Sequence, residues 1–177
     1  ISLLDYASPG VYLTQKSVTE KQAHIAATVK LSNASATKQV NVKVSVKDHD
    51  KTIQEIKRHV TLNAHSEGET IIPFTIQNPR LWNGREDPFM YRAEISLWEN
   101  DKLLDKVIQP LGIRYYRVDP DNGFFLNGKH LPLYGVCRHQ DRAEIGNALR
   151  SMHHEEDTEL MLEMGVNAVR LAHYQQA

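Results

Sequence analysis

Two stretches near the C-terminal end decide the fold of this 177-residue chain: GVCRH at residues 135–139 and NAVRLAHY at residues 167–174. Each is a short apolar run that ends in Arg and His. Between them lie a polar loop and a segment whose apolar residues, Leu160, Met161 and Met164, recur at helical spacing. This order of strand, loop, helix and strand, with polar side chains just past each strand, is typical of a parallel βα barrel, in which active-site residues stand at the strand ends.

The segment between the two strands carries the signals of one helix. Ser151 is the predicted N-cap, and the acidic run at residues 155–157 places negative charge near the helix N-terminus. Gly165 is the predicted glycine that follows the last turn. We interpret the apolar stripe of this helix as core. The right-handed crossover rule then makes the two flanking strands parallel.

Upstream, the chain alternates apolar and polar residues, which indicates strands with one buried face. The alternation is clearest at residues 23–31 and in the four valines of residues 40–46. Further strands are expected at residues 11–16, 53–62, 70–76, 91–98 and 103–113. About seven short strands with regular turn signals predict an antiparallel β-sandwich of immunoglobulin type.

Two local features refine this picture. Two prolines interrupt the strand pattern at residues 78–89, so we expect an irregular crossover loop there, with Trp82 in a packing role rather than as a stacking surface for a ligand. Asn127-Gly128 stands between two apolar runs and predicts a tight hairpin, because both residues accept positive φ angles.

Composition excludes several classes of function. The formal net charge of -1 gives no reason to expect nucleic acid or an anionic membrane as a partner, and no apolar run approaches the roughly 20 residues of a membrane span. The single cysteine, Cys137, excludes an internal disulfide, and we interpret it as a small buried side chain. Without an initiator Met or a signal segment, the chain is expected to be a piece of a longer protein, with the compartment, bacterial cytoplasm or periplasm, left open.

The motifs at residues 135–139 and 167–174 resemble the entry to the catalytic barrel of glycoside hydrolase family 2, which holds β-galactosidases, β-glucuronidases and β-mannosidases. Residues 82–91, 112–114 and 123–128 add similarity in the family's usual order, so that the resemblance runs from Val11 to Tyr174. Residues 138–142 and 171–176 look most like bacterial β-galactosidases. Two positions depart from the family's pattern: Cys137 stands where Asn is common, and Gln175 where Pro is usual.

The resemblance implies a mainly β chain in two parts. Residues 1–118 form an immunoglobulin-like antiparallel β-sandwich, and residues 119–177 form the truncated first βαβ unit of a (β/α)8 barrel. An N-terminal jelly roll and the remainder of the barrel, both absent from this chain, are then its partners within the same parent protein. The βαβ unit is expected to expose apolar surface that those barrel strands would cover.

The resemblance also implies a sugar site at the two strand ends. His139 and His173 would donate hydrogen bonds to hydroxyls of the terminal sugar, and Arg170 would keep a neighbouring nucleophilic carboxylate ionised. Arg138 is counted with these substrate-binding residues, either supporting the site from behind or forming an ion pair. A structural ion pair is the alternative for Arg170 as well.

Neighbouring residues receive more modest interpretations. Tyr174 is either a packing residue or a wall of the subsite. The adjacent His153 and His154 are interpreted as a solvated helix start rather than a metal site, because neighbouring helical residues point in different directions.

The expected parent enzyme hydrolyses terminal β-D-galactosides of an oligosaccharide or glycan with retention of configuration. Retaining glycosidases use two carboxylates about 5–5.5 Å apart, and in this family both are glutamates on later strands. We therefore expect no catalytic residue, metal or cofactor in this chain, which would be inactive alone. A divalent metal and a homo-oligomeric state of the parent are left open. The alternatives are a β-glucuronidase or β-mannosidase of the same family, and a non-catalytic immunoglobulin-like spacer or binding module.

Overall fold

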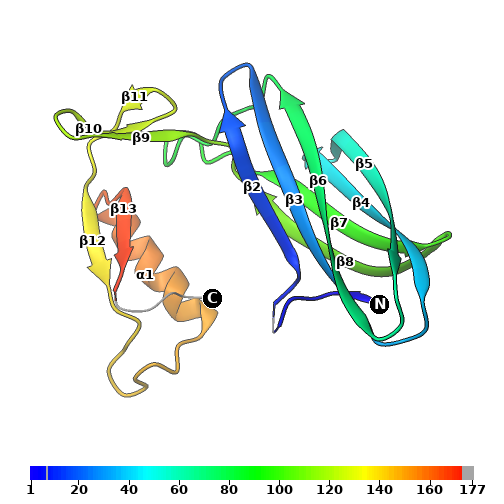
Figure 1. The fold of residues 1–177 in the computed structure, drawn as a ribbon. Helices are drawn as coiled ribbons and strands as arrows, with labels where there is room; N and C mark the ends of the chain where they lie inside the picture. The colour runs from blue at the N-terminus through cyan, green and yellow to red at the C-terminus, as the bar shows by residue number, and fades with distance from the viewer. Residues whose placement is uncertain (7, 173–177) are drawn as a thin grey trace. The chain divides into compact units, whose positions relative to one another are not determined.

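The chain divides into two compact units, Ile1–Tyr115 and Tyr116–Ala177, and the computed structural model describes residues 1–6 and 8–172 (Figure 1). Thirteen strands and one helix lie within those described residues. The sequence predicted parts at 1–118 and 119–177, a boundary three residues later than the division after Tyr115. That domain boundary stays a prediction.

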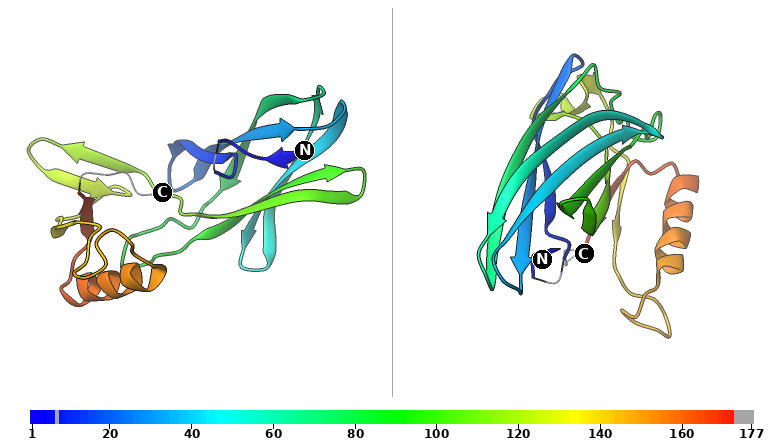
Figure 2. Two further views of the ribbon diagram at one scale, coloured as in Figure 1. Left: turned by 90° about the horizontal axis from the view of Figure 1, so that it is seen from below. Right: turned by 90° about the vertical axis from the view of Figure 1, so that its right-hand side faces the viewer.

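The first unit consists of two antiparallel sheets, which confirms the predicted immunoglobulin-like sandwich. In the first sheet, one edge of the central strand β3 pairs with β6 along its whole length, and the other edge pairs with β2 and then β1. The second sheet has the order β5-β4-β7-β8. Figure 2 shows the two layers from two further directions. The strands are β1 (Ser2–Leu3), β2 (Val11–Val18), β3 (Gln22–Asn33), β4 (Lys38–Asp48), β5 (Lys51–Leu62), β6 (Ser66–Gln77), β7 (Tyr91–Glu99) and β8 (Lys102–Leu111).

The core of this unit lies between the sheets and follows from the period-two alternation. In β4 the valines at alternate positions 40–46 are at most 1% exposed, while Lys43 and Lys47 on the same strand point to the opposite face. Ile95 of the neighbouring β7 is fully buried, and Ile25 of the opposing sheet is only 1% exposed. Inward-facing β-branched residues from both sheets therefore close one continuous core.

The interrupted segment between β6 and β7 packs onto the sandwich, as expected for Trp82. The backbone N–H of Trp82 donates to the carbonyl of Ile113 at 2.8 Å, and the Arg114 guanidinium lies 5.1 Å from the centre of the Trp82 ring. A Cβ atom built on Gly112 would lie in ordinary contact with Trp82 at 3.4 Å but only 2.7 Å from the Sδ atom of Met90, so the glycine leaves room for the Met90 side chain. The packing role predicted for Trp82 is confirmed.

The second unit opens with a three-stranded antiparallel sheet in the order β11-β10-β9. Its strands are β9 (Tyr116–Asp119), β10 (Gly123–Leu126) and β11 (Lys129–His130). The turn between β10 and β11 is Asn127-Gly128, with φ angles of 49° and 80°. Two consecutive positive φ angles identify the type I′ geometry that the sequence predicted.

After the hairpin come β12 (Gly135–Arg138), α1 (Ser151–Glu163) and β13 (Ala168–Leu171). The strands β12 and β13 pair in parallel, which confirms the predicted βαβ unit. Arg138 is the last residue of β12, so His139 is the first residue after the strand. Gly165 follows the C-cap residue Met164 and has a positive φ of 80°, which confirms the prediction that a glycine ends the helix.

The predicted start of α1 was wrong by one residue. Arg150, in extended conformation, is the N-cap, and Ser151 is the first helical residue. The Nδ1 atom of His153 accepts the backbone N–H of Arg150 at 3.1 Å, the part that a carboxylate plays in a capping box. The acidic residues 155–157 come after the first turn. With 13 residues, many of them charged, α1 is not the kind of helix that crosses a membrane.

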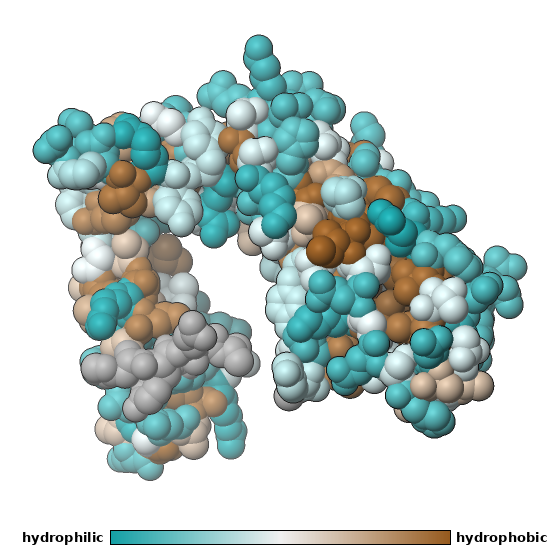
Figure 3. All heavy atoms as spheres, viewed as in Figure 1, coloured by the Kyte–Doolittle hydropathy of each residue, from teal (hydrophilic) through white to brown (hydrophobic). Residues whose placement is uncertain are grey.

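Two predictions of burial in this unit were wrong. Leu160 is 53% exposed and Met164 is 72% exposed, and α1 contains no buried residue, so the apolar stripe is not a core in this chain, and the predicted exposure of apolar surface on the βαβ unit is confirmed. Cys137 is exposed rather than buried. The physical reason is shared: β12 and β13 form a sheet of only two strands, which offers little to cover these side chains. Figure 3 shows apolar side chains at the surface of this unit.

Candidate active site

The two strand ends that carry the candidate site residues lie side by side. Arg138 and Leu171 are partners in the parallel register, and one step further the backbone N–H of Ala172 donates to the carbonyl of Arg138 at 2.9 Å. His139 is the next residue after Arg138. His173 follows Ala172 and lies outside the described residues. Arg138 and Ala172, the residues that precede His139 and His173, therefore lie side by side at one edge of the sheet.

Arg138 and Arg170 belong to opposite faces of this sheet. Arg170 is paired with Cys137, and successive side chains of a strand alternate between faces, so Arg170 and Arg138 point in opposite directions. The side chain of Arg138 contacts α1, which identifies the face that the helix covers. In a βα barrel the helices lie outside the strands, so the face of Arg170 corresponds to the barrel interior. The exposed side chain of Arg170 is consistent with that direction.

Arg138 forms an ion pair with the helix. Its Nε and Nη2 atoms donate to Oδ2 of Asp157 at 2.8 and 2.6 Å, and Nη2 also lies 2.8 Å from Nδ1 of His154. Because a guanidinium can only donate, Nδ1 of His154 is the acceptor of this hydrogen bond. Only 13% of the Arg138 side chain is exposed. The ion-pair alternative for Arg138 is thus observed, while sugar contacts of His139, Arg170 and His173 stay predictions.

The loop between β12 and α1 is tied to the helix by a second arginine. Arg142 Nη2 donates to Glu156 Oε2 at 2.6 Å, and the backbone N–H of Arg142 donates to the carbonyl of Gly146 at 3.1 Å. The Arg142 and Glu156 side chains are 35% and 54% exposed, so this pair is far more accessible to water than the pair of Arg138 with Asp157. Since the loop follows the C-terminal end of a strand, it stands on the edge where barrel enzymes build their sites.

The two adjacent histidines are more than a solvated helix start. His153 caps the helix through its Nδ1 atom, and His154 accepts a hydrogen bond from Arg138. The signal for the second role was present in the sequence, because His154 and Asp157 are three residues apart and share a helix face. The sequence did not show toward which face of the sheet the Arg138 side chain points. Among the residues that the structure describes, no group of three or more His, Cys, Asp or Glu is arranged to hold a metal ion.

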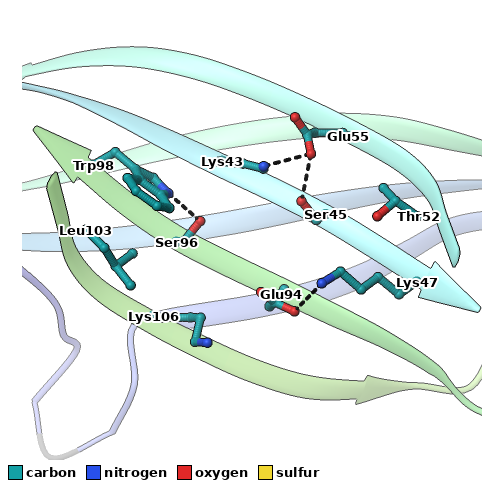
Figure 4. A pocket seen from close by; sticks show the side chains of 10 residues that line it. All are labelled: Lys43, Ser45, Lys47, Thr52, Glu55, Glu94, Ser96, Trp98, Leu103 and Lys106. Carbon is teal, nitrogen blue, oxygen red and sulfur yellow. Dashed lines mark hydrogen bonds and ion pairs between the residues drawn. The ribbon is translucent and has the colours of Figure 1, made fainter. Parts of the chain in front are cut away.

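The sandwich has a groove of ≈ 300 Å³ on the outer face of its second sheet, and Figure 4 shows its lining. Here Lys43 pairs with Glu55 at 2.7 Å, and Lys47 pairs with Glu94 at 2.9 Å. The hydrogen bond from each lysine is the main reason that the pKa of its glutamate lies below the usual value. A glycosidase acid needs a carboxyl whose pKa is raised so that it keeps its proton. The groove is therefore a ladder of ion pairs without an acid of that kind.

Known proteins resemble this chain over its whole length. A β-glucuronidase of Bacteroides fragilis is 60% identical over 177 residues, which are 100% of this chain and 26% of that protein. The β-galactosidase BoGH2A of Bacteroides ovatus is 30% identical over 93% of this chain and 19% of its own length. Bacteroides uniformis β-glucuronidase 2, in a structure covalently bound to cyclophellitol-6-carboxylate aziridine, has a TM-score of 0.92 and 32% identity over 99% of this chain and 22% of that one.

This chain thus spans about a quarter or less of the length of these relatives. Two family models match it, in the order in which the units occur. Residues 9–114 match the model of glycosyl hydrolases family 2, and residues 118–177 match the TIM barrel domain of the same family. With more than half of its residues in the first match, the chain belongs to glycosyl hydrolases family 2.

Proposed function

We propose that the full-length protein of which this chain is a part hydrolyses terminal β-D-glucuronides with retention of configuration. The observation that carries the proposal is the 60% identity to a β-glucuronidase across all 177 residues. The β-galactoside expected from the sequence motifs therefore becomes the second candidate substrate. The β-glucuronide, which was the alternative, becomes the first.

The proposed chemistry is a double displacement on two carboxylates. One attacks the anomeric carbon and the other protonates the leaving oxygen, then activates water to release the sugar. A relative in the same family forms a covalent complex with a carboxylate-bearing aziridine, which fits an enzyme with a nucleophile of this kind. Both carboxylates are expected outside this chain, so the 177-residue chain alone has no activity.

Residues of this chain would supply the surroundings of those carboxylates. Arg170, on the face of the sheet turned away from α1, would hold the nucleophile ionised by its fixed positive charge. His139, the next residue after β12, and His173, the second residue after β13, would donate hydrogen bonds to ring hydroxyls. The substrate carboxylate needs further basic groups, which we place elsewhere in the full-length protein.

The second candidate substrate is a terminal β-D-galactoside. It is favoured by the 30% identity to a Bacteroides ovatus β-galactosidase and by the sequence at residues 138–142. The two sugars differ at C5, where glucuronide carries a carboxylate and galactoside a hydroxymethyl group, and in the configuration at C4. A site built for the carboxylate leaves its basic groups unpaired with a galactoside, which makes discrimination strong.

The test is a comparison of chromogenic β-glucuronide, β-galactoside and β-mannoside with the full-length protein, beside its Arg170→Ala and His173→Ala variants. We expect the glucuronide to have the highest kcat/KM, the β-anomer to be the first product seen by NMR, and each variant to lose roughly a hundredfold or more in kcat/KM. A faster galactoside would establish the second candidate instead. If no sugar were cleaved, the spacer or binding module of the sequence analysis would replace both.

A further inference from the structure

We infer that Arg138 is a positioning residue, which sets the separation and direction of the two strand ends that carry His139 and His173. The inference rests on the proposed function for its effect on catalysis, and on the observed contacts for its structural part. It assigns Arg138 a role that needs no contact with the sugar.

Three elements meet at Arg138. Its backbone carbonyl accepts the N–H of Ala172 at 2.9 Å, which joins the end of β12 to the residue that follows β13. Its side chain reaches α1 through Asp157 and His154. The same residue therefore fixes one strand end to the next through its backbone and to the helix through its guanidinium.

The geometry of the side-chain contact suits a positioning role. Two donors of one planar guanidinium converge on a single oxygen of Asp157, and a third contact to His154 fixes the plane of the group. Lysine offers a single point charge and could not reproduce this arrangement. Because 87% of the Arg138 side chain is covered, removing Asp157 would leave a poorly solvated charge rather than a water-exposed one.

The position of Arg138 makes its effect on the site direct. His139 is its next residue, and His173 is the next residue after Ala172, so a shift of the Arg138 peptide would displace both predicted sugar contacts. A misplacement of about 1 Å at a reacting site can cost on the order of a hundredfold in rate. By contrast, the side chain of Arg138 lies on the face covered by α1, opposite the face of Arg170.

A sugar contact and a positioning role make different predictions for Asp157. We therefore compare kcat and KM of the full-length protein with a chromogenic β-glucuronide for Arg138→Met, Asp157→Asn and the double variant. If Arg138 acts through the helix, each single variant loses roughly tenfold to a hundredfold in kcat/KM. The kcat/KM of the double variant is then no lower than that of the less active single variant. If Arg138 binds the sugar, Asp157→Asn keeps wild-type activity and the inference is overturned.

The matched control is Glu156→Gln, which breaks the neighbouring, more exposed ion pair with Arg142 on the same helix. We expect its kcat/KM to stay within about twofold of wild type, since exposed pairs contribute little. Assays run well below the melting temperature of each variant, with the active fraction titrated by a covalent inhibitor, separate misplacement from simple loss of folded enzyme. An Asp157→Asn loss that disappears after this correction would also overturn the inference.

Hydrogen exchange of the same preparations tests the structural part without any activity. The amide of Ala172, bonded to the Arg138 carbonyl, should exchange at least about tenfold faster in Asp157→Asn than in wild type or Glu156→Gln. Equal exchange in all three would contradict the inference even if activity fell. If the wild-type protein hydrolysed no glycoside, the proposed function would fail, and the exchange result alone would decide whether Arg138 holds the two strand ends.

Discussion

In the first unit Val44 and Ile95 are fully buried, whereas in the second unit Leu160 and Met164 are 53% and 72% exposed. Both pairs of residues belong to regular apolar patterns, of period two in the strands and of helical period in α1. In the first unit the pattern identified the buried face of each strand, whereas in α1 the residues turned toward the sheet include the polar His154 and Asp157. The pattern did not tell whether another layer covers the apolar face.

The difference follows from how each architecture closes. A sandwich of two antiparallel sheets buries the inner face of each sheet against the other, and both sheets lie within residues 1–115. A βα barrel closes only when its strands form a ring, and β12 and β13 supply two parallel strands. Hence we expect the sandwich to hold most of the stability of this chain, while the βαβ unit depends on further barrel strands.

The largest contrast should appear in limited proteolysis of the 177-residue chain. Protease needs a locally opened backbone, and opening is easiest where few apolar contacts must be broken. We expect cleavage within residues 116–172 at least about a hundredfold faster than within the sandwich, leaving a resistant N-terminal core. Mass spectrometry of a trypsin time course would identify the fragments. Equal resistance of both units would break the comparison.

Truncation of a buried side chain sharpens the same contrast. Ile95→Ala should lower the free energy of unfolding of the sandwich by about 2–5 kcal/mol, because it removes contacts and leaves a cavity among fully buried neighbours. The matched Leu160→Ala in α1 should change the free energy by less than about 0.5 kcal/mol, since that side chain is half exposed already. Urea unfolding measures both. Similar losses from the two variants would show that α1 is packed in solution.

The sequence predicted well wherever local chemistry decides the structure. The alternation at residues 23–31 and 40–46 became two central strands, Asn127-Gly128 became a type I′ turn, and β12 and β13 pair in parallel. In each case the residues act on their own backbone or on a neighbouring strand, so periodicity and turn preference are sufficient information.

The candidate site was predicted in part. Cys137 was predicted to be buried because no catalytic partner stands beside it in the sequence, and this was wrong. Arg138 was counted with the substrate-binding residues with an ion pair as its alternative, and the ion pair is what the structure shows. The register of β12 with β13 places Arg138 on the face opposite Arg170, which is the face of α1, where Arg138 meets His154 and Asp157. Side-chain direction at a strand end depends on register with the next strand, which no short motif reports.

A smaller effect is expected from the hairpin turn of the second unit. Asn127 has a φ of 49° and is 7% exposed, so Asn127→Ala places an alanine, whose Cβ disfavours this conformation, in the left-handed region at a cost of about 1–2 kcal/mol. Asn127→Gly accepts that φ angle and serves as the control for backbone strain. Hydrogen exchange of the Leu131 amide, which donates to the Phe124 carbonyl at 2.8 Å, reports the local free energy of opening. Equal exchange in both variants would attribute the loss to the side chain instead.

The smallest effect concerns the acidic turn after β9. Asp119 accepts hydrogen bonds from the Asn122 side chain at 3.0 Å and backbone at 2.9 Å and pairs with Arg117, and these contacts lower its pKa from 3.8 to about 2. Because the folded pKa is lowered, the carboxylate stabilises the turn fully above the unfolded value near 3.8, and this contribution is lost as the pH falls toward 2.

An NMR titration of the Asp119 carboxyl carbon would measure that pKa. The Asp119→Asn variant should show faster exchange of the Asn122 amide than wild type at neutral pH, and the two should converge as the pH approaches 2. The effect is small because the carboxylate is at the surface, where water screens its partners. A titration of Asp119 near 3.8 would mean that the turn is open in solution. In that case the weakness of the second unit would extend from its uncovered helix back to its first strand.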